Sequence, residues 1–289
     1  RTPVVGSFIN EFLPWQDLIS YLDAILRVYN RYGRRDNKYK ARIKILVKAL
    51  TPEVFAEKVE AEMVHLRGGT TTLTEAEVQR VSRHFVDPEY LALDNVDYTA
   101  LDAEHPGFAR WRSRNTRAHK RPGYVAVTLS LKPTGVAPGD LTDKQLDAVA
   151  DLAERYSFGF LRTSHEQNII LADVEQRQLH ALWLELREGG FATPNIGLLT
   201  DIICCPGGDY CSLANAKSIP IAESIQRRFD DLDYLFDIGE IDLNISGCMN
   251  ACGHHHIGNI GILGVDKNGS EWYQVTIGGA QGKASALGK

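Results

Sequence analysis

The sequence predicts an α+β fold, and two observations support this prediction. First, residues 121–193 show strand and helix patterns in the order strand, helix, strand, strand, helix, which is most of a split β-α-β unit. Second, all five cysteines and much of the glycine lie after Pro194, so a part with different chemistry follows. We therefore expect four segments: a helical, basic part at 1–66, a linker with short helices at 67–120, the split β-α-β domain at 121–193, and a cysteine-bearing α/β domain at 194–289.

The first segment contains two predicted helices around a basic run. Apolar residues at three-and-four spacing predict a helix over 13–31. Thr51 and Pro52 predict the start of a second helix, with Thr51 as its cap and Pro52 in its first turn. Between these helices, the stretch from Arg34 to Lys48 holds seven cationic residues and one acid.

The third segment has the clearest pattern. In chain order we expect a strand over 124–131, a helix that begins with a capping box of Thr142 and Gln145, short strands over 158–162 and 168–171, and a helix capped by Asp173 and ended by Gly189 and Gly190. This order is that of a ferredoxin-like unit. Such a unit is a scaffold, and it does not by itself specify a chemistry.

Composition excludes several classes of function. The net charge of -5 gives no sign of nucleic-acid binding, and no run of about 18 apolar residues predicts a membrane span. No secretory signal, dinucleotide-binding glycine motif or Walker A loop is visible. Five cysteines do not make a disulfide framework, so we expect a reducing cytoplasmic location in which the thiols serve as ligands.

The cysteines form two short pairs, and these predict an iron–sulfur site. Five residues separate Cys205 from Cys211, and three separate Cys248 from Cys252. A [4Fe–4S] cube needs four thiolates, one for each iron, and two pairs on separate loops can supply them. Zinc also binds four cysteines, but usually with closer spacing within a pair, and two disulfides would leave one thiol over. Cys204, the fifth cysteine, is interpreted as a small buried residue beside the cluster loop.

The chain resembles the sirohaem-dependent sulfite and nitrite reductase haemoproteins. The forms Cys-Pro-Gly-x-x-Tyr-Cys at 205–211 and Gly-Cys-x-Asn-x-Cys-Gly-His at 247–254 are similar to the signature of that family. The likeness extends to residues 162–169 and to the basic run at 41–44. It implies the haemoprotein fold of this family, close to the bacterial sulfite reductase β-type, and a C-terminal portion of it, because the full haemoprotein has a further N-terminal half.

The resemblance implies two cofactors and their ligands. Cys205, Cys211 and Cys248 would each hold one iron of a [4Fe–4S] cluster, and Cys252 would bridge the cluster to the iron of a sirohaem. Asn250, within the second motif, is assigned to the cofactor site. The three histidines that follow, residues 254–256, are interpreted as packing residues near the cofactor and not as ligands.

Cations are expected beside the substrate and the sirohaem. Arg42 and Lys44 are two residues apart, so on an extended segment both side chains would point to one face and could bind an anion and relay protons. The alternative is a solvated basic surface, which is what most charge runs are. The stretch 115–120 resembles a sirohaem-contacting segment, which implies Asn115 and Lys120 as cofactor contacts, and Arg35 is a further candidate.

The resemblance implies an assimilatory sulfite reductase, which reduces sulfite to sulfide by six electrons. A nitrite reductase that forms ammonia with the same cofactors is the first alternative, and a cluster-bearing electron-transfer module without haem is the second. A zinc-stabilised binding domain is a third. The expected electron donor is ferredoxin or a flavoprotein reductase, and no nucleic-acid or membrane partner is expected.

Overall fold

The computed structural model describes residues 3–289, so Arg1 and Thr2 of the expected first segment lie outside it. The chain divides into two compact units, of which one extends to Glu89 and the other comprises Tyr90–Lys289. Each unit has its own hydrophobic core. The expected linker at 67–120 is thus divided between the two units.

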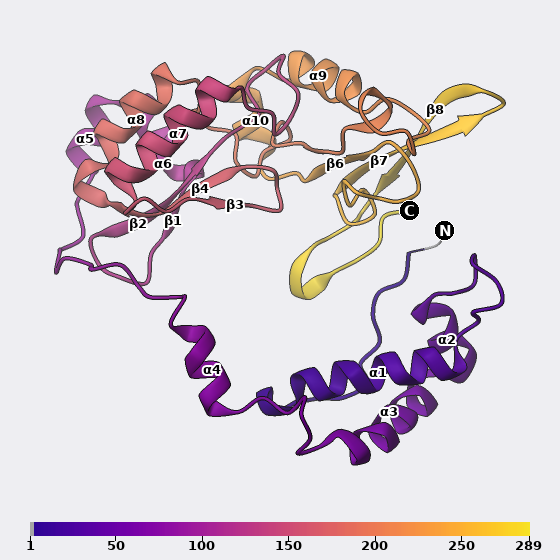
Figure 1. The fold of residues 1–289 in the computed structure, drawn as a ribbon. Helices are drawn as coiled ribbons and strands as arrows, with labels where there is room; N and C mark the ends of the chain where they lie inside the picture. The colour runs from indigo at the N-terminus through magenta and orange to yellow at the C-terminus, as the bar shows by residue number, and fades with distance from the viewer. Residues whose placement is uncertain (1–2) are drawn as a thin grey trace. The chain divides into compact units, whose positions relative to one another are not determined.

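The unit that extends to Glu89 is helical (Figure 1). After a short 3-10 turn at Trp15–Asp17, it contains α1 (Leu18–Tyr32), α2 (Ile43–Leu50), α3 (Pro52–Leu66) and α4 (Glu75–Ser82). Its core is made by Tyr21, Ala24 and Val28 of α1, Leu46 of α2, and Phe55, Val59, Met63 and Leu66 of α3. Burial of these side chains holds helices that would be marginal alone.

The predicted start of α3 agrees with the structure, but the basic run before it differs. The Thr51 hydroxyl accepts a hydrogen bond from the Val54 N–H at 3.5 Å, and Pro52 opens the helix. Arg42 is extended, but the chain becomes helical at Ile43. An extended segment through Arg42 and Lys44 is therefore wrong, because the apolar residues from Ile43 to Leu50 form a helix that packs into the core.

The second unit begins with a ferredoxin-like part. It comprises α5 (Thr99–Glu104), α6 (Pro106–Asn115), β1 (Thr116–Ala118), β2 (Tyr124–Leu129), α7 (Asp143–Tyr156), β3 (Arg162–Thr163), β4 (Ile169–Glu175), a 3-10 turn (Gln176–Gln178) and α8 (Leu179–Glu188). The four strands form an antiparallel sheet in the order β1-β2-β4-β3. Figure 1 shows the helices together on one side of this sheet. The outer position beside β2 is filled by β1, which precedes it in the chain.

Two details of this part differ from the sequence prediction. Helix α6 belongs to the ferredoxin-like core, since Phe108 and Trp111 are fully buried against β2 and α8 residues, so 106–115 is not a linker. Asp173 does not cap a helix. It is buried in β4, where it accepts hydrogen bonds from the Tyr90 hydroxyl at 2.6 Å and from His119. The capping box of Thr142 and Gln145 is present as predicted.

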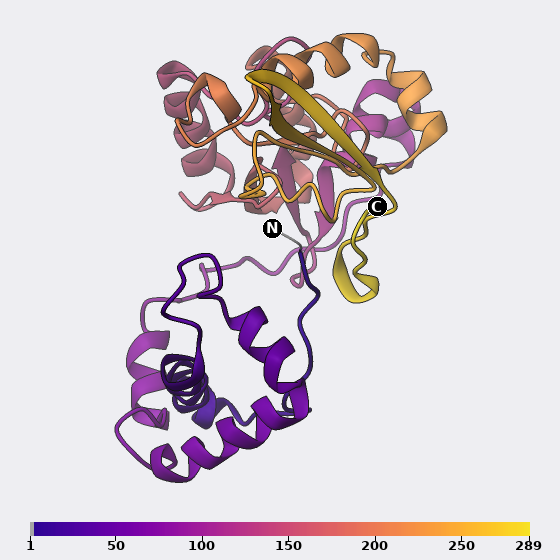
Figure 2. The ribbon, with the colours of Figure 1, turned by 90° about the vertical axis from the view of Figure 1, so that its right-hand side faces the viewer.

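The last part is a mixed α/β layer. It contains β5 (Ile203–Cys204), a 3-10 turn (Gly207–Asp209), α9 (Ile219–Arg228), α10 (Leu232–Ile238), β6 (Leu243–Ser246), β7 (Ile260–Lys267), β8 (Ser270–Ile277) and a 3-10 turn (Gly282–Ala284). The sheet order is β5-β6-β7-β8, with β5, β6 and β7 parallel and β8 antiparallel to β7. Strands β7 and β8 form the long hairpin drawn in yellow in Figure 2.

Helices α9 and α10 provide the crossover between β5 and β6, as parallel strands require. Their apolar side chains and those of the strands form the core of this part, which includes Ile202, Cys204, Leu235 and Ile245. Over residues 3–289, no helix has the length and apolar character needed to cross a membrane.

Candidate metal centre

Two neighbouring parallel strands end at the cysteine loops. Strand β5 ends at Cys204 and β6 at Ser246, and the register pairs Cys204 with Ile245. The Cys205 N–H donates to the Ile245 carbonyl at 3.1 Å, so the pairing continues for one residue past β5. Because parallel strands end at the same edge of a sheet, Cys205 and Cys248 enter their loops side by side.

Gly247 joins the two cysteine loops. Its N–H donates to the Cys205 Sγ at 3.0 Å. Its carbonyl accepts the N–H groups of Asn215 at 2.8 Å and Ala216 at 3.1 Å, on the loop that follows Cys211. A Cβ at position 247 would lie 2.7 Å from the Gly207 Cα, so only glycine lets the backbones approach this closely.

The second pair sits on a tight turn. The Ala251 N–H donates to the Cys248 carbonyl at 3.1 Å, and Ala251 has φ of +59°, which is unusual for a residue with a side chain. The Gly253 N–H donates to the Ser246 Oγ at 3.1 Å. These contacts return the chain at Cys252 to the end of β6. Ser246 was not named from the sequence, and nothing in the local pattern distinguishes it from other serines.

The cysteines differ in exposure. Cys205 and Cys248 are buried, Cys211 is intermediate and Cys252 is exposed. Cys204 points into the core of this part, and its thiol donates to the Cys205 carbonyl at 3.3 Å. Burial raises the pKa of the Cys204 thiol, which opposes the thiolate form that a ligand needs.

The four cysteines provide the donor set of a four-iron cluster, which binds one thiolate at each iron. Within residues 3–289, no three His, Cys, Asp or Glu side chains are grouped closely enough to hold one ion. Four thiolates around a single zinc would have to converge on that ion, whereas in a cube each thiolate binds its own iron and the thiolates lie further apart. Four cysteines on loops joined by backbone hydrogen bonds, with an N–H directed at a sulfur, suit the cube.

Asn115 is the last residue of helix α6. Its side chain is fully buried at the end of α6. The side-chain amide donates to the Thr128 carbonyl at 3.0 Å and to the Thr193 carbonyl at 3.1 Å. Both N–H groups of the amide are thus used on backbone carbonyls, whereas its Oδ1 is buried with no hydrogen-bond partner among the described residues, and contact of Asn115 with sirohaem stays a prediction. The residue links β2 to the segment after α8.

The other predicted cofactor contacts are accessible. Asn250, beside Cys248, and Lys120, after β1, are both exposed. Arg35 is exposed in the other unit, where its guanidinium donates to the Asn30 side chain at 2.5 Å.

Arg42 and Lys44 lie in the helical unit, at the N-terminus of α2. Arg42 is the N-cap residue and Lys44 lies in the first helical turn, so the argument from an extended segment does not hold. Lys44 also lines a cavity of about 550 Å³ within this unit, together with Lys48 and apolar residues such as Ile25 and Phe55. Two cations at a helix N-terminus produce a locally positive region.

The histidines after the second motif have different environments. His254 is exposed, whereas His255 is buried and its two ring nitrogens have no hydrogen-bond partner among the described residues. Burial lowers the pKa of His255 to about 4, and the neighbouring His256 lowers it further in the same direction. His255 is therefore neutral at physiological pH and acts in packing, with its ring centroid 3.8 Å from that of His256.

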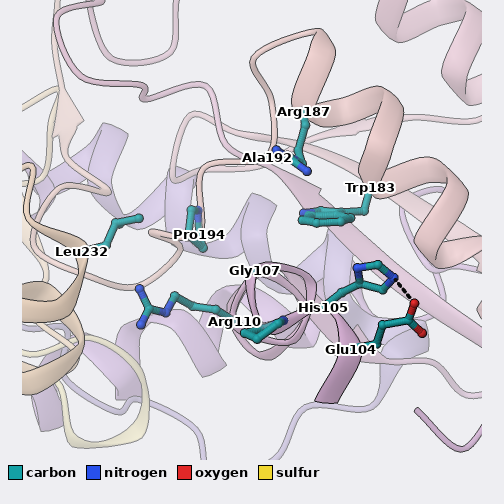
Figure 3. Close-up of a pocket in the computed structure, with 10 residues that line it drawn as sticks. Glu104, His105, Gly107, Arg110, Trp183, Arg187, Ala192, Pro194 and Leu232 are labelled. Carbon is teal, nitrogen blue, oxygen red and sulfur yellow. Dashed lines mark ion pairs between the residues drawn. The ribbon is translucent and has the colours of Figure 1, made fainter. Parts of the chain in front are cut away.

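The structure also has a pocket of about 610 Å³ that the sequence analysis did not predict (Figure 3). It is lined by residues of the ferredoxin-like part and by Pro194 and Leu232. Arg110 and Arg187 are at its margins, but Arg110 is paired with Asp233 at 2.7 Å and Arg187 lies over the ring of Trp183. None of the predicted cofactor ligands lines this pocket.

Comparison with known proteins identifies two matching family models. The model described as the nitrite and sulphite reductase 4Fe-4S domain matches residues 1–66, and that of the nitrite/sulfite reductase ferredoxin-like half domain matches residues 118–189. Residues 1–66 contain no cysteine, so the four predicted ligands lie outside both matches.

The curated relatives include proteins named nitrite reductase and proteins named sulfite reductase. A chloroplastic ferredoxin–nitrite reductase of Betula pendula is 28% identical over 94% of this chain and 42% of its own length. Sulfite reductase [ferredoxin] 2 of Mycolicibacterium paratuberculosis is 26% identical over 99% of this chain and 47% of its own length. The chain thus spans a little less than half the length of these relatives.

A solved structure has the same fold. The Mycobacterium tuberculosis NirA protein matches 100% of this chain and 48% of its own, with a TM-score of 0.67 and 23% sequence identity. The α+β architecture with its ferredoxin-like unit is therefore confirmed. Two family models of nitrite and sulfite reductases thus match separate parts of the chain, and the curated relatives that it resembles along most of its length carry the names of nitrite and sulfite reductases.

Proposed function

We propose that this chain is the cluster-bearing part of an enzyme that reduces sulfite to sulfide by six electrons, with a [4Fe–4S] cluster and a sirohaem as cofactors. The observation that carries the proposal is the joining of Cys205 and Cys248 at the ends of two adjacent parallel strands, with the Gly247 N–H directed at the Cys205 sulfur. Ile202, Leu235 and Ile245 already fill the hydrophobic core of this part, so the two cysteine loops are not needed for its packing.

The four cysteines would bind different parts of the two cofactors. When bound, the two cofactors would supply electrons one at a time and an iron that binds the substrate anion. Cys205, Cys211 and Cys248 would hold three irons within the protein. Cys252 is the exposed member of the four, which suits a thiolate shared with a second cofactor outside the loops. The Gly247 N–H donates a hydrogen bond to the Cys205 sulfur, which would help to orient this ligand.

Arg42 and Lys44 are proposed to bind the substrate anion and to supply protons to its leaving oxygens. Support comes from their position at the N-terminus of α2, where the helix dipole adds to the two positive charges. Sulfite and nitrite are both small oxyanions that such charges attract. Lys120, Asn250 and Arg35 are proposed as contacts to the polar rim of the sirohaem, since all three are exposed.

Nitrite is the second candidate substrate, because the relative from Betula pendula carries the name of a nitrite reductase. Ferredoxin is the electron donor that both relatives' names support, in preference to a flavoprotein. Steady-state assays with reduced ferredoxin and either anion would decide between the substrates. A kcat/KM for sulfite at least equal to that for nitrite supports the proposal, and the reverse order identifies a nitrite reductase.

The cofactor proposal is tested by analysis of the intact protein, purified without oxygen. Iron, zinc and acid-labile sulfide are measured with the absorption spectrum, and about five irons with sirohaem bands are expected per chain. Cluster absorption without sirohaem would identify an electron-transfer module instead. Zinc without sulfide would contradict both.

The anion proposal is tested by Arg42→Ala and Lys44→Ala. Loss of a charge that stabilises the reacting anion should reduce kcat/KM by about tenfold to a hundredfold, with the cofactor spectrum unchanged. Arg27→Ala is the matched control, because Arg27 is an exposed cation of the same unit and is paired with Asp23. Turnover equal to that of the control in both variants would remove Arg42 and Lys44 from the substrate site.

A further inference from the structure

The side chain of Gln167 pairs with the backbone of the residue that precedes the first cluster ligand. Its Nε2 donates to the Cys204 carbonyl at 2.8 Å, and its Oε1 accepts the Cys204 N–H at 2.7 Å. Strand β5 is at the edge of its sheet, and Cys205 points its N–H to the neighbouring strand β6. The backbone groups of Cys204 face the opposite way, so the Gln167 amide occupies the place of a missing strand.

Gln167 is held in a conformation that directs its amide at this edge. It lies in the turn between β3 and β4 and has φ of +60°, a region that residues with side chains seldom adopt. The Gln167 N–H donates to the Ser164 carbonyl, and the Ser164 N–H to the Asn168 carbonyl, which closes the turn. Such local strain persists where the surrounding structure enforces it, as at a functional site.

A buried ion pair fixes both neighbours of Gln167. The Lys132 Nζ, which has no exposed surface, lies 2.7 Å from the Asp201 carboxylate and also donates to the Glu166 carbonyl. The same carboxylate oxygen accepts the Asn168 side-chain amide at 3.0 Å. The turn of the ferredoxin-like sheet is thereby anchored to Asp201, three residues before Cys204 in the chain.

We propose that Gln167 is a positioning residue for the cluster: its amide fixes the Cys204 backbone and so holds the Cys205 sulfur against the Gly247 N–H. This inference depends on the proposed cluster at Cys205. A hydrogen bond to a ligand sulfur raises the reduction potential of a cluster, so a looser Cys205 changes that potential as well as the retention of iron. The ferredoxin-like part therefore tunes the metal centre through one side chain.

The test uses the intact holoprotein and Gln167→Met, which keeps the length of the side chain but forms neither hydrogen bond. Two measurements are made: the rate of iron loss to a chelator and the midpoint potential of the cluster by redox titration with electron paramagnetic resonance. Loss of the two bonds should speed iron loss by about threefold to thirtyfold and shift the potential to a lower value. Gln274→Met is the matched control, since Gln274 is an exposed glutamine on β8.

Each outcome has one meaning. A potential and an iron-loss rate equal to those of the Gln274→Met control overturn the proposal, and faster iron loss with an unchanged potential shows a purely structural residue and also overturns it. If Gln167→Met does not fold, Gln167→Glu decides by the same measurements, because its carboxylate accepts the Cys204 N–H but cannot donate to the carbonyl. A wild-type protein without iron and sulfide contradicts the proposed cluster itself, separately from the role of Gln167.

Discussion

Replacement of Gly247 by alanine should separate the two cysteine loops. The added Cβ would lie 2.7 Å from the Gly207 Cα and 2.8 Å from the Ala216 carbonyl oxygen. Both neighbours are backbone atoms, so neither can move aside by a change of rotamer. Ordinary contact begins near 3.4 Å, and the loops must therefore part by roughly 0.7 Å.

The cost follows from the contacts that this movement weakens. Three hydrogen bonds involve Gly247: its N–H to the Cys205 Sγ at 3.0 Å, and the Asn215 and Ala216 N–H groups to its carbonyl at 2.8 and 3.1 Å. Overpacking costs about 1 to 3 kcal/mol and each weakened bond about 1 kcal/mol. We expect Gly247→Ala to lower the free energy of unfolding of the apoprotein by about 4 to 6 kcal/mol.

The assay is urea unfolding of the apoprotein, together with iron and sulfide analysis of the intact protein after anaerobic purification. Iron content should fall to less than about half of the wild-type value, because the first ligand pair no longer faces the second. Gly107→Ala is the control, since its Cβ would meet only the Trp183 ring at an ordinary 3.6 Å. Wild-type stability and iron content in Gly247→Ala would refute the close approach of the two loops.

Two further predictions concern buried charges. Lys132→Met should lower the free energy of unfolding, measured in urea, by about 3 to 5 kcal/mol, because it leaves the Asp201 carboxylate buried without its partner. Adding Asp201→Asn should recover part of this loss. No recovery in the double variant would contradict the pairing. The pKa of His255 is lowered to about 4 by burial, so between pH 6.5 and 4 the folded protein binds fewer protons than the unfolded chain. Stability should then fall as the pH falls through this range, by at most about 1.4 kcal/mol per pH unit, and His255→Leu should lose this component in urea unfolding measured at each pH.

Local patterns predicted the elements whose causes are local. The cap at Thr51 and the capping box of Thr142 and Gln145 appear as expected, because each depends on residues within one helical turn. The prediction that Asp173 caps a helix is wrong because the contacts of Asp173 are not local. Its partners, Tyr90 and His119, are more than fifty residues away in the chain, so no window around Asp173 could indicate them.

Charge patterns alone could not decide the conformation of the basic run. The spacing of Arg42 and Lys44 suits a strand, but the apolar residues between Ile43 and Leu50 have a face that packs on α1 and α3, and their burial makes the segment helical. Asn115 shows the same limit. Its amide joins β2 to the segment after α8, and the sequence around Asn115 does not indicate these partners.

The sequence by itself determined the four thiols and the family to which they point, because the two cysteine pairs with their glycines form a distinctive local pattern. Only the tertiary structure decided how the pairs meet. Parallel pairing of β5 with β6 brings Cys205 and Cys248 to one edge, and Gly247 and Gln167 hold the loops there from residues more than 35 positions apart in the chain. The partners of these contacts lie in distant segments, so no local window of the sequence indicates which residues meet.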